Sequence, residues 1–238
     1  MIDDHETLAE RLAVARQSGG VADIPPLALA AGYDIARRLA PRLGTVLGWK
    51  IGATSSGAMA FLKVDAPIHG RLFALWQDGD VIDLPGGRPV EVEPEILFVL
   101  GADLQLVAAH FGVEFNRPSL ADPFGSGAGA IVADNAASLG VLVGPPLALA
   151  DLDAPEALVA RLEIEGVAVA QGSADAVLGH PARALAALRT ALAHDPRGLC
   201  AGDIIASGAM CRSVLITRGQ ALRLDAGHRG AAAVRLAA

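Results

Sequence analysis

The sequence is poor in several residue types, and each shortage narrows what the protein can be. Aromatic residues make up only 4% of the 238 residues, so small and aliphatic side chains must fill the core. The two cysteines, Cys200 and Cys211, have the spacing of neither a CxxC redox motif nor a thiolate zinc site, which predicts reduced thiols. Lys and Arg are scattered and the net charge is -7, which argues against a nucleic-acid surface, because binding phosphates needs clustered basic side chains.

Long hydrophobic runs are also lacking. No uninterrupted apolar run reaches the roughly 18 to 20 residues of a membrane-spanning helix, and Pro145 and Pro146 break the best candidate. The first six residues are acidic and lack the basic and apolar regions of a secretory signal. We therefore expect a cytoplasmic protein that contacts neither membrane nor nucleic acid and whose partners are small molecules.

Apolar residues, in contrast, make up 53% of the chain, which is enough for one large domain or for a main domain with a small addition. Turn residues are concentrated between Gln77 and Pro89 and predict a boundary there. Residues 1–75 are expected to form a small, mainly helical region that contributes Lys50. Residues 76–238 are expected to form a domain of mixed β structure, because short apolar strands dominate there.

Hydrophobic spacing and turn residues predict the individual elements. Helices are expected from Asp3 or Asp4 to about Gln17, from about Pro26 to Leu43 and from about Pro181 to His194. Strands are expected at Thr45–Gly52, Glu93–Leu100, Gly129–Val132, Leu139–Val143, Leu162–Ala170, Ile204–Ala206, Val214–Ile216, Ala221–Leu224 and Ala231–Leu236. Alternation in the first strand places Trp49 and Ile51 on one face and Lys50 on the other, over an open surface.

The most informative motif is Glu93-Pro94-Glu95, at the start of an otherwise apolar strand. Alternate residues of an extended chain share a face, so Glu93 and Glu95 point the same way, with Cα atoms roughly 6.5 to 7 Å apart. Two such carboxylates can converge on one metal ion, whereas a core-facing pair without a cation carries a large desolvation cost. For an isolated Glu-x-Glu, the solvated face of an amphipathic strand is the commoner explanation, so the metal hypothesis needs support from elsewhere.

Two glycine-flanked motifs do not indicate a site. Gly125–Gly129 resembles a dinucleotide-binding loop, but a loop-like run rather than a strand precedes it, so a flexible loop is expected. Gly198–Gly202 has the spacing of a nucleophile elbow with Cys200 at the nucleophile position. The predicted helix comes before it and a strand after it, which reverses the order that an elbow requires, so Cys200 is expected to be structural.

Six short segments, taken in order, carry a family resemblance. They are Gly48–Ser55, Pro67–Leu72, Val92–Ile96, Val113–Phe115, Ala133–Ser138 and Leu199–Asp203. Together they resemble the signature of the 2-keto-4-pentenoate hydratase group, which includes 4-oxalocrotonate decarboxylases and belongs to the fumarylacetoacetate hydrolase superfamily. The resemblance implies an α+β fold, with a small helical amino-terminal region packed on a mixed β-sandwich or roll, and it implies a homo-oligomer.

The resemblance also implies a metal centre in residues 76–238. Members of the superfamily bind one divalent metal, usually Mg²⁺ or Mn²⁺, through a Glu-x-Glu pair and a third acidic residue further along, which here are Glu93, Glu95 and Glu114. Three carboxylates suit a hard cation and leave coordination positions for water and a chelating substrate. A small 2-oxo or 2-hydroxy acid would chelate the ion, which then stabilises an enolate as a Lewis acid.

The activity that the resemblance implies is hydration of a 2-hydroxy-2,4-dienoate in aromatic-compound catabolism. Lys50 matches the group's lysine and is a candidate proton donor or carboxylate anchor. His69 is a candidate acid-base group, because Ile68 replaces an acidic residue that many members carry in this segment. The candidate substrate-binding residues are Arg71, Asn135, Ser138 and Ser207.

Three alternatives stay open at this point. Decarboxylation of a 4-oxalocrotonate-like diacid would use the same enolate and needs a cationic pocket for a second carboxylate, for which Arg71 and Arg117 are candidates. Hydrolysis of a carbon-carbon bond in an acylpyruvate needs a base such as His69. A non-catalytic binding homologue is suggested by Ile68 and by the lack of a family threonine near Ser207.

Overall fold

A side-chain cap and a glycine set the ends of the first helix. In the computed structural model, which describes residues 4–238, the Asp4 side chain accepts a hydrogen bond from the backbone N–H of Glu6, and Gly19 closes the helix in the left-handed region (φ 70°). The α-helices are α1 (His5–Ser18), α2 (Leu29–Leu43), α3 (Ser56–Leu62), α4 (Gly127–Ala133) and α5 (Pro181–Ala191). None of the helices within residues 4–238 has the length and apolar character needed to traverse a bilayer.

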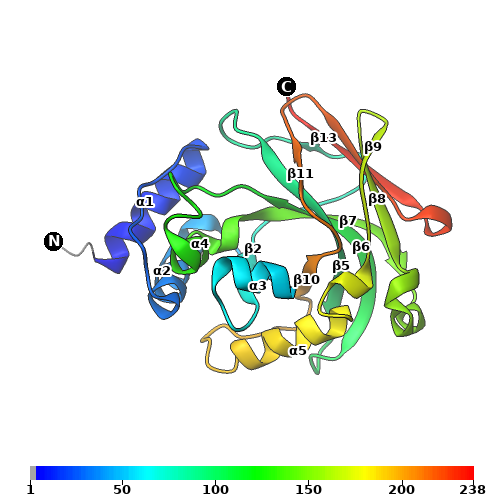
Figure 1. Ribbon diagram of the computed structural model, residues 1–238, viewed down its shortest axis with the longest axis horizontal. Coiled ribbons are helices and arrows are strands. Elements are labelled where there is room, and N and C mark those ends of the chain that lie inside the picture. Colours follow the sequence, from blue (N-terminus) through cyan, green and yellow to red (C-terminus); the bar gives the residue numbers. More distant parts are fainter. Residues whose placement is uncertain (1–3) are drawn as a thin grey trace.

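Helices α1, α2 and α4 pack together at one end of the molecule (Figure 1). The buried side chains that join them include Leu8, Leu12, Ile35, Leu39 and Ala130. Helices α2 and α4 approach closely because Gly32 and Gly129 meet at their contact, where a Cβ on Gly32 would lie 2.1 Å from the backbone oxygen of Gly129. The helical layer therefore combines the amino-terminal helices with one from the second half of the chain.

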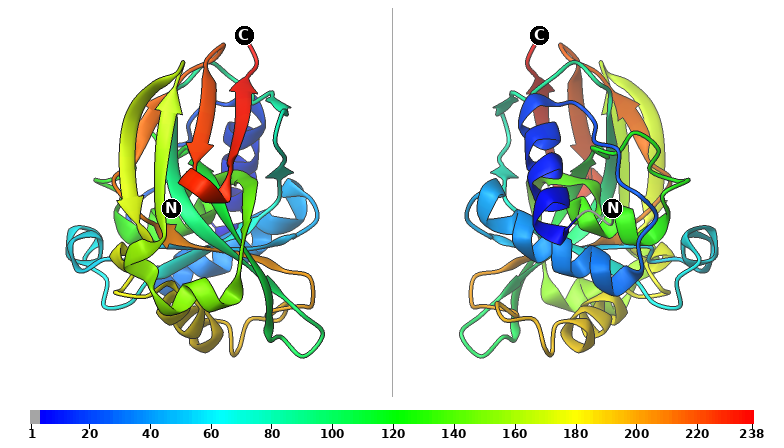
Figure 2. Two further views of the ribbon diagram at one scale, coloured as in Figure 1. Left: turned by 90° about the vertical axis from the view of Figure 1, so that its right-hand side faces the viewer. Right: turned by 90° about the vertical axis from the view of Figure 1, so that its left-hand side faces the viewer.

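Within residues 4–238 the strands form an eight-stranded and a five-stranded sheet, both curled, as Figure 2 shows. The larger sheet contains β1 (Gly48–Gly52), β2 (Ile68–Leu72), β3 (Leu75–Trp76), β5 (Val90–Leu100), β6 (Leu106–Asn116), β7 (Ser138–Leu147), β10 (Ile204–Ala209) and β11 (Val214–Ile216). Its order is β2-β1-β10-β5-β6-β7-β3, and β11 also pairs with β5. The smaller sheet, in the order β4-β13-β12-β8-β9, contains β4 (Val81–Ile82), β8 (Val159–Ile164), β9 (Val167–Ser173), β12 (Ala221–Asp225) and β13 (Ala231–Leu236).

The main hydrophobic core lies between the two sheets. Phe98 and Phe111 of the larger sheet and Leu162 and Leu224 of the smaller sheet are among its fully buried side chains. This α+β architecture is the one that the family resemblance implies. Because β1 and β2 pair within the same sheet as β5 and β6, part of residues 1–75 is joined to the strands that carry the acidic residues. The division at residue 75 stays a prediction.

Four expectations for local structure are wrong. Residues 129–132, predicted as a strand, lie in α4, which also takes up part of the glycine-rich segment expected to be a loop. Its glycines have low helix propensity, and packing against α2 stabilises the helix instead. The single strand predicted at Leu162–Ala170 is a hairpin, because Glu165 and Gly166 turn the chain at positive φ (49° and 78°). Lys50 is buried, not set over an open surface.

The sequence-based assignment also missed α3, β2 and β6. Strand β6 is the most consequential of these, since it carries Glu114 and pairs with β5 along its whole length. Its sequence mixes small, aromatic and charged residues, so it lacks the continuous apolar run by which the neighbouring β5 was recognised.

A buried ion pair holds α1 against the rest of the molecule, and its removal should destabilise the fold. Arg16 Nη1 lies 2.8 Å from a carboxylate oxygen of Asp134, and this carboxyl is fully buried. We expect Arg16→Ala to lower the free energy of unfolding by about 3 kcal/mol, because the Asp134 charge loses its cation. Urea denaturation followed by circular dichroism measures the change. As a control, Arg42→Ala breaks an exposed pair with Glu6 and should leave the midpoint almost unchanged; equal losses in both variants would contradict this account.

Candidate metal centre and active site

The register of β5 and β6 brings the three predicted ligands onto one face of the larger sheet. Glu93 pairs directly with Glu114, and Glu95 pairs with Gly112. Directly paired residues of antiparallel strands point to the same side, and so do residues two apart on one strand. One carboxylate oxygen of each of Glu93, Glu95 and Glu114 accordingly lies within 4.8 Å of the other two. The three carboxylates therefore converge rather than splay apart.

Burial makes this cluster electrostatically costly without a cation. Glu95 and Glu114 are each 1% exposed. Burial, reinforced by the charge of Glu114, raises the pKa of Glu93 to about 7 and raises the pKa of Glu95 well above its ordinary value. The backbone N–H of Gly208 donates to Glu95 Oε2 at 2.8 Å, and this hydrogen bond and the charge of Lys50 lower the pKa of Glu95 in part.

Lys50 is the positively charged member of the cluster. Its Nζ lies 3.2 Å from Glu114 Oε2, and its side chain is 6% exposed. Burial opposes the charge of Lys50, but the nearby Glu114, Glu93 and Glu95 outweigh this effect and raise its pKa. Lys50 belongs to β1, and β10 lies between β1 and β5. Ala206 of β10 pairs with Lys50 on one side and with Leu97 of β5 on the other. Lys50 therefore stays protonated near neutral pH beside the carboxylates.

The donor set fits a divalent cation. Glu95 Oε1 and Glu114 Oε1 are both buried and have no hydrogen-bond partner among the described residues. Such atoms normally find a partner, because a buried unsatisfied acceptor costs free energy. Carboxylate oxygens are the ligands that Mg²⁺, Mn²⁺ and Ca²⁺ prefer. A divalent cation between Glu93, Glu95 and Glu114 would bind both unpartnered oxygens. It would also take the place of the protons that the raised pKa values of Glu93 and Glu95 favour.

Asn116 belongs to this cluster and was not predicted. Its Nδ2 donates to Glu114 Oε2 at 3.0 Å and lies 3.4 Å from Glu93 Oε2, so it fixes two of the carboxylates. The Oδ1 atom of Asn116 is buried and accepts no hydrogen bond from any of residues 4–238. The signal was present in the sequence, since Asn116 follows Glu114 by two residues and must share its face if the segment is a strand.

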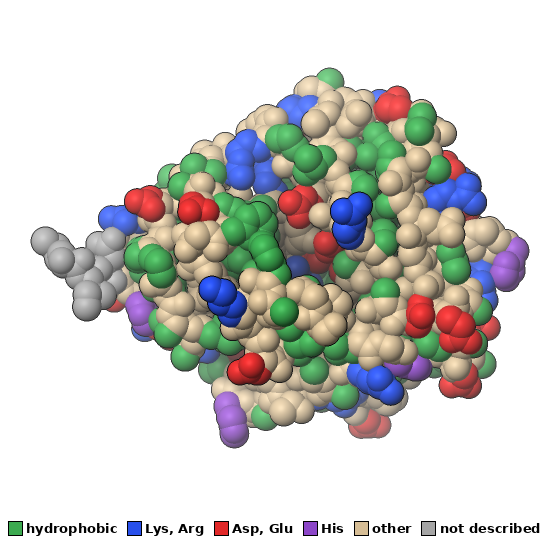
Figure 3. All heavy atoms as spheres, in the orientation of Figure 1, with side chains coloured by type: hydrophobic (Ala, Val, Ile, Leu, Met, Phe, Trp, Pro, Cys, Tyr) green, Lys and Arg blue, Asp and Glu red, His purple; other side chains and the backbone are tan. Residues whose placement is uncertain are grey.

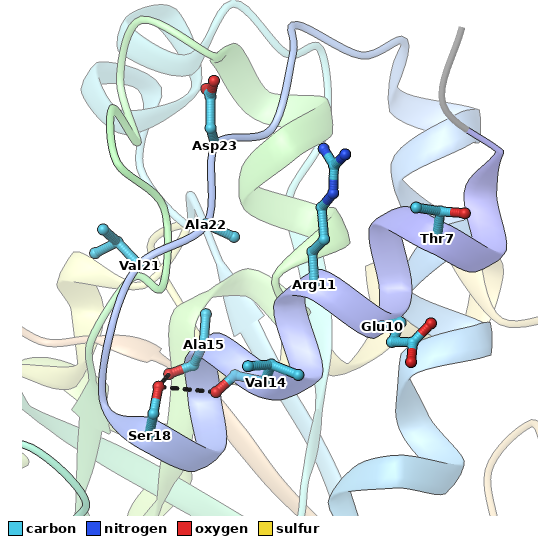
Figure 4. Close-up of a pocket in the computed structure, with 9 residues that line it drawn as sticks. All are labelled: Thr7, Glu10, Arg11, Val14, Ala15, Ser18, Val21, Ala22 and Asp23. Carbon is cyan, nitrogen blue, oxygen red and sulfur yellow. Dashed lines mark hydrogen bonds between the residues drawn. The ribbon is translucent and has the colours of Figure 1, made fainter.

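A cleft of about 910 Å³ opens over this cluster. Glu93 lies in its lining, together with the end of β1, helix α3 and the segment after β10. Figure 3 shows the hollow, with acidic side chains at its bottom and a basic side chain at its rim. A separate groove of about 540 Å³ runs along α1 (Figure 4), and its lining from α1 and residues 21–23 contains none of the predicted site residues.

The structure does not bring His69 or Arg71 to the carboxylates. Across β1 and β2, His69 pairs with Ile51 and Arg71 pairs with Trp49, so both side chains lie on the face opposite to Lys50. The His69 ring stacks on the Tyr33 ring, with the two ring centres 4.3 Å apart. Burial, assisted by the charge of Arg71, lowers the pKa of His69 to about 4. His69 is therefore neutral at physiological pH and does not adjoin the metal cluster.

Arg71 and Asn135 are both occupied in holding strand β2. The Arg71 guanidinium lies 2.9 Å from Asp195 and 4.7 Å from the centre of the Trp49 ring. The Asn135 side chain accepts from the Arg71 backbone N–H at 2.7 Å and donates to the Arg71 carbonyl at 2.8 Å. Asn135 thus uses its side chain to hold the backbone of β2.

The two predicted serines lie nearer to the cluster. Ser138 pairs with Asn116 across β7 and β6, and Ser207 precedes the Gly208 N–H that binds Glu95. Both hydroxyls are buried, and neither has a hydrogen-bond partner among residues 4–238. Of the four predicted substrate-binding residues, Ser138 and Ser207 are strand neighbours of residues that bind the carboxylates, whereas Arg71 is bound by Asp195 and Asn135 by the backbone of β2.

Comparison with known proteins places this geometry among enzymes of one group. No protein-family model matches the chain. It is 34% identical over 215 residues to the 4-oxalocrotonate decarboxylase of Pseudomonas sp. (strain CF600), covering 83% of this chain and 81% of the relative. It is 32% identical over 240 residues to the 2-keto-4-pentenoate hydratase 2 of Dechloromonas aromatica (strain RCB), covering 94% of this chain and 86% of the relative.

Solved structures give the same grouping. The 4-oxalocrotonate decarboxylase from Pseudomonas putida G7, complexed with magnesium and adipate, superposes with a TM-score of 0.84 at 26% identity, covering 98% of this chain and 97% of that one. A fumarylpyruvate hydrolase from Pseudomonas aeruginosa, in complex with Mn²⁺ and pyruvate, shares the fold with a TM-score of 0.56 at 14% identity, covering 79% of this chain and 88% of the other. Both of these neighbours hold divalent metals.

Proposed function

Because the chain belongs to the group of 2-keto-4-pentenoate hydratases and 4-oxalocrotonate decarboxylases of the fumarylacetoacetate hydrolase superfamily, we propose that it is a metal-dependent hydratase. It adds water to a 2-hydroxy-2,4-dienoate during the breakdown of aromatic compounds. The observation that carries this proposal is the buried cluster of Glu93, Glu95 and Glu114, with two unpartnered oxygens, beneath a cleft large enough for a small acid. Mg²⁺ and Mn²⁺ are the proposed ions.

The three carboxylates would hold the ion, and the ion would supply Lewis acidity to the oxygens of a 2-oxo or 2-enol acid. Asn116 keeps Glu93 and Glu114 in place through its amide N–H groups. The burial of Glu95 and Glu114 removes water from the base of the cleft, which strengthens every charge interaction there. The chain thus contributes a preorganised anionic site that is complementary to a cation and an anionic substrate.

Lys50 is the proposed acid. The neighbouring carboxylates raise its pKa and favour the ammonium form, so it can donate a proton to the dienol carbon skeleton or anchor a carboxylate. Ser138 and Ser207 are proposed to bind substrate oxygens, because their hydroxyls are buried without a partner among residues 4–238 and they neighbour Asn116 and Gly208, which bind the carboxylates. His69 and Arg71, on the opposite face, receive no support from the geometry for the roles that the sequence suggested.

The second candidate is decarboxylation of a 4-oxalocrotonate-like diacid. It is favoured by the 34% identity to a decarboxylase and by the TM-score of 0.84 to another. The same cation and the same Lys50 would serve that reaction, since both reactions develop an enolate. Hydrolysis of an acylpyruvate receives less support, because the base proposed for it, His69, is turned away from the carboxylates.

A homo-oligomeric state and a cytoplasmic location are part of this proposal.

One assay separates the candidates. The purified protein, with Mg²⁺ or Mn²⁺, is incubated with 2-hydroxypenta-2,4-dienoate and, separately, with 4-oxalocrotonate, while the loss of conjugated absorbance and the release of carbon dioxide are recorded. A hydratase gives a 4-hydroxy-2-oxo acid without carbon dioxide, and a decarboxylase releases one carbon dioxide for each diacid consumed. Inertness toward both substrates with either metal would refute the proposed enzyme and leave a binding homologue.

A further inference from the structure

One basic side chain lies at the cleft without any known task. Arg212 belongs to the short connection between β10 and β11, two strands that both pair with β5 on the same side. The connection runs beside the Glu-x-Glu segment, because the Met210 N–H donates to the Pro94 carbonyl at 2.9 Å. Arg212 lines the same cleft as Glu93. The fold therefore holds a guanidinium at the cleft that Glu93, a member of the carboxylate cluster, also lines.

Arg212 differs from the other arginines near the site in its pairing. No hydrogen bond or ion pair with a described residue occupies its guanidinium, whereas Arg71 and Arg197 are bound by Asp195 and Asp203. Among the described residues that line the cleft, Arg212 is the only one with a positive charge. An exposed guanidinium without a carboxylate partner is available to a ligand, and its planar geometry suits a carboxylate.

The net charge of the site with a divalent cation bound shows why a ligand with a second carboxylate would need Arg212. The three carboxylates and Lys50 together carry two negative charges when all are ionised, which a divalent cation cancels. A carboxylate that chelates the ion leaves the site with one net negative charge, so a second carboxylate at the far end of the ligand meets no unpaired positive charge there. It needs a cation of its own, and Arg212 is the one that the cleft provides.

We propose that Arg212 binds the distal carboxylate of a dicarboxylic substrate and makes the protein select 2-oxo or 2-hydroxy diacids over the corresponding monoacids. The inference rests on the proposed function and deepens it by naming the substrate class. Arg71 and Arg117, the arginines that the sequence suggested for this role, are less suited. Arg71 lies on the opposite face of the sheet, and Arg117 is buried and lines a neighbouring pocket.

A matched pair of ligands tests the proposal by calorimetry, without turnover. Adipate and hexanoate have six carbons each and differ in the presence of a second carboxylate. With Mg²⁺ present, the wild-type protein should bind adipate about 10-fold more tightly than hexanoate, and Arg212→Ala should remove this preference by weakening adipate alone. Arg212→Lys should retain part of it, because the charge remains while the bidentate geometry is lost. Arg161→Ala, an exposed arginine outside the cleft lining, serves as the control and should change neither affinity.

Measurements of turnover then distinguish the role of Arg212 from the proposed enzymatic function. Arg212→Ala should lower kcat/KM for 4-oxalocrotonate about 10-fold, mainly through KM, and leave kcat/KM for 2-hydroxypenta-2,4-dienoate within a factor of about two. Equal losses for both substrates, or an unchanged adipate preference in Arg212→Ala, would overturn the role of Arg212 while the enzyme assignment stands. If neither substrate is consumed but the adipate preference depends on Arg212, the enzyme assignment fails and the diacid site remains.

Discussion

Replacing Glu95 by Gln should abolish tight binding of Mg²⁺ and Mn²⁺ and lower kcat/KM by about 1000-fold, which corresponds to roughly 4 kcal/mol of transition-state stabilisation. The substitution keeps the shape of the side chain and removes one of three anionic ligands from a site where the unpartnered Oε1 of Glu95 is positioned to bind a cation. Isothermal calorimetry measures the metal affinity, and a steady-state assay with each metal measures the loss of activity. Glu93→Gln should also lower the metal affinity and kcat/KM.

Two controls show that the loss concerns the metal and not the fold. Glu91→Gln changes a carboxylate on the same strand, two residues before Glu93, that lies outside the cluster, and it should bind metal as the wild type does. In the metal-free protein, Glu95→Gln should not lower the melting temperature, because burial already raises the pKa of Glu95 and favours its uncharged form. Unchanged metal affinity in both the Glu93 and Glu95 variants would remove these residues from the coordination sphere.

Much of this site could be predicted because its geometry follows from one periodicity. Residues two apart on a strand share a face whatever the strand pairs with, so Glu93 and Glu95 were brought together by their spacing alone. Glu114 required the family resemblance, because the register that sets it opposite Glu93 depends on β6, a strand that its mixed composition concealed. Asn116 would have followed from the same alternation once β6 was known.

The residues that the sequence misplaced depend on pairing between distant segments. His69 and Arg71 lie within the family segment Pro67–Leu72, yet their faces are set by the antiparallel register with Ile51 and Trp49, which no local pattern reveals. The exposure expected for Lys50 failed for a related reason: β10, from near the carboxyl end of the chain, joins β1 to β5, and on this shared sheet Lys50 is buried against Glu114 of β6. Helix α4 likewise owes its existence to its contact with α2, which overrides the low helix propensity of its glycines.

Replacing Lys50 by Met should separate metal binding from chemistry. Methionine keeps the length and apolar packing of the side chain but removes the ammonium that lies 3.2 Å from Glu114 Oε2. We expect kcat to fall about 100-fold or more, which is the usual contribution of a positioned general acid. Metal affinity should be retained or increased, because a positive charge that competes with the cation for Glu114 is gone. Calorimetry with Mg²⁺ and stopped assays at saturating substrate measure the two effects.

The comparison with Lys50→Arg and Lys63→Met makes this result specific. Arginine keeps the charge but cannot give up a proton near neutral pH, so Lys50→Arg should also lose kcat if the lysine donates a proton, and should keep much of it if the lysine only anchors a carboxylate. Lys63, an exposed residue at the end of α3, should tolerate Met without loss. Normal turnover in Lys50→Met would exclude Lys50 from the reaction. Loss of the metal together with turnover would instead assign it to holding the carboxylates apart.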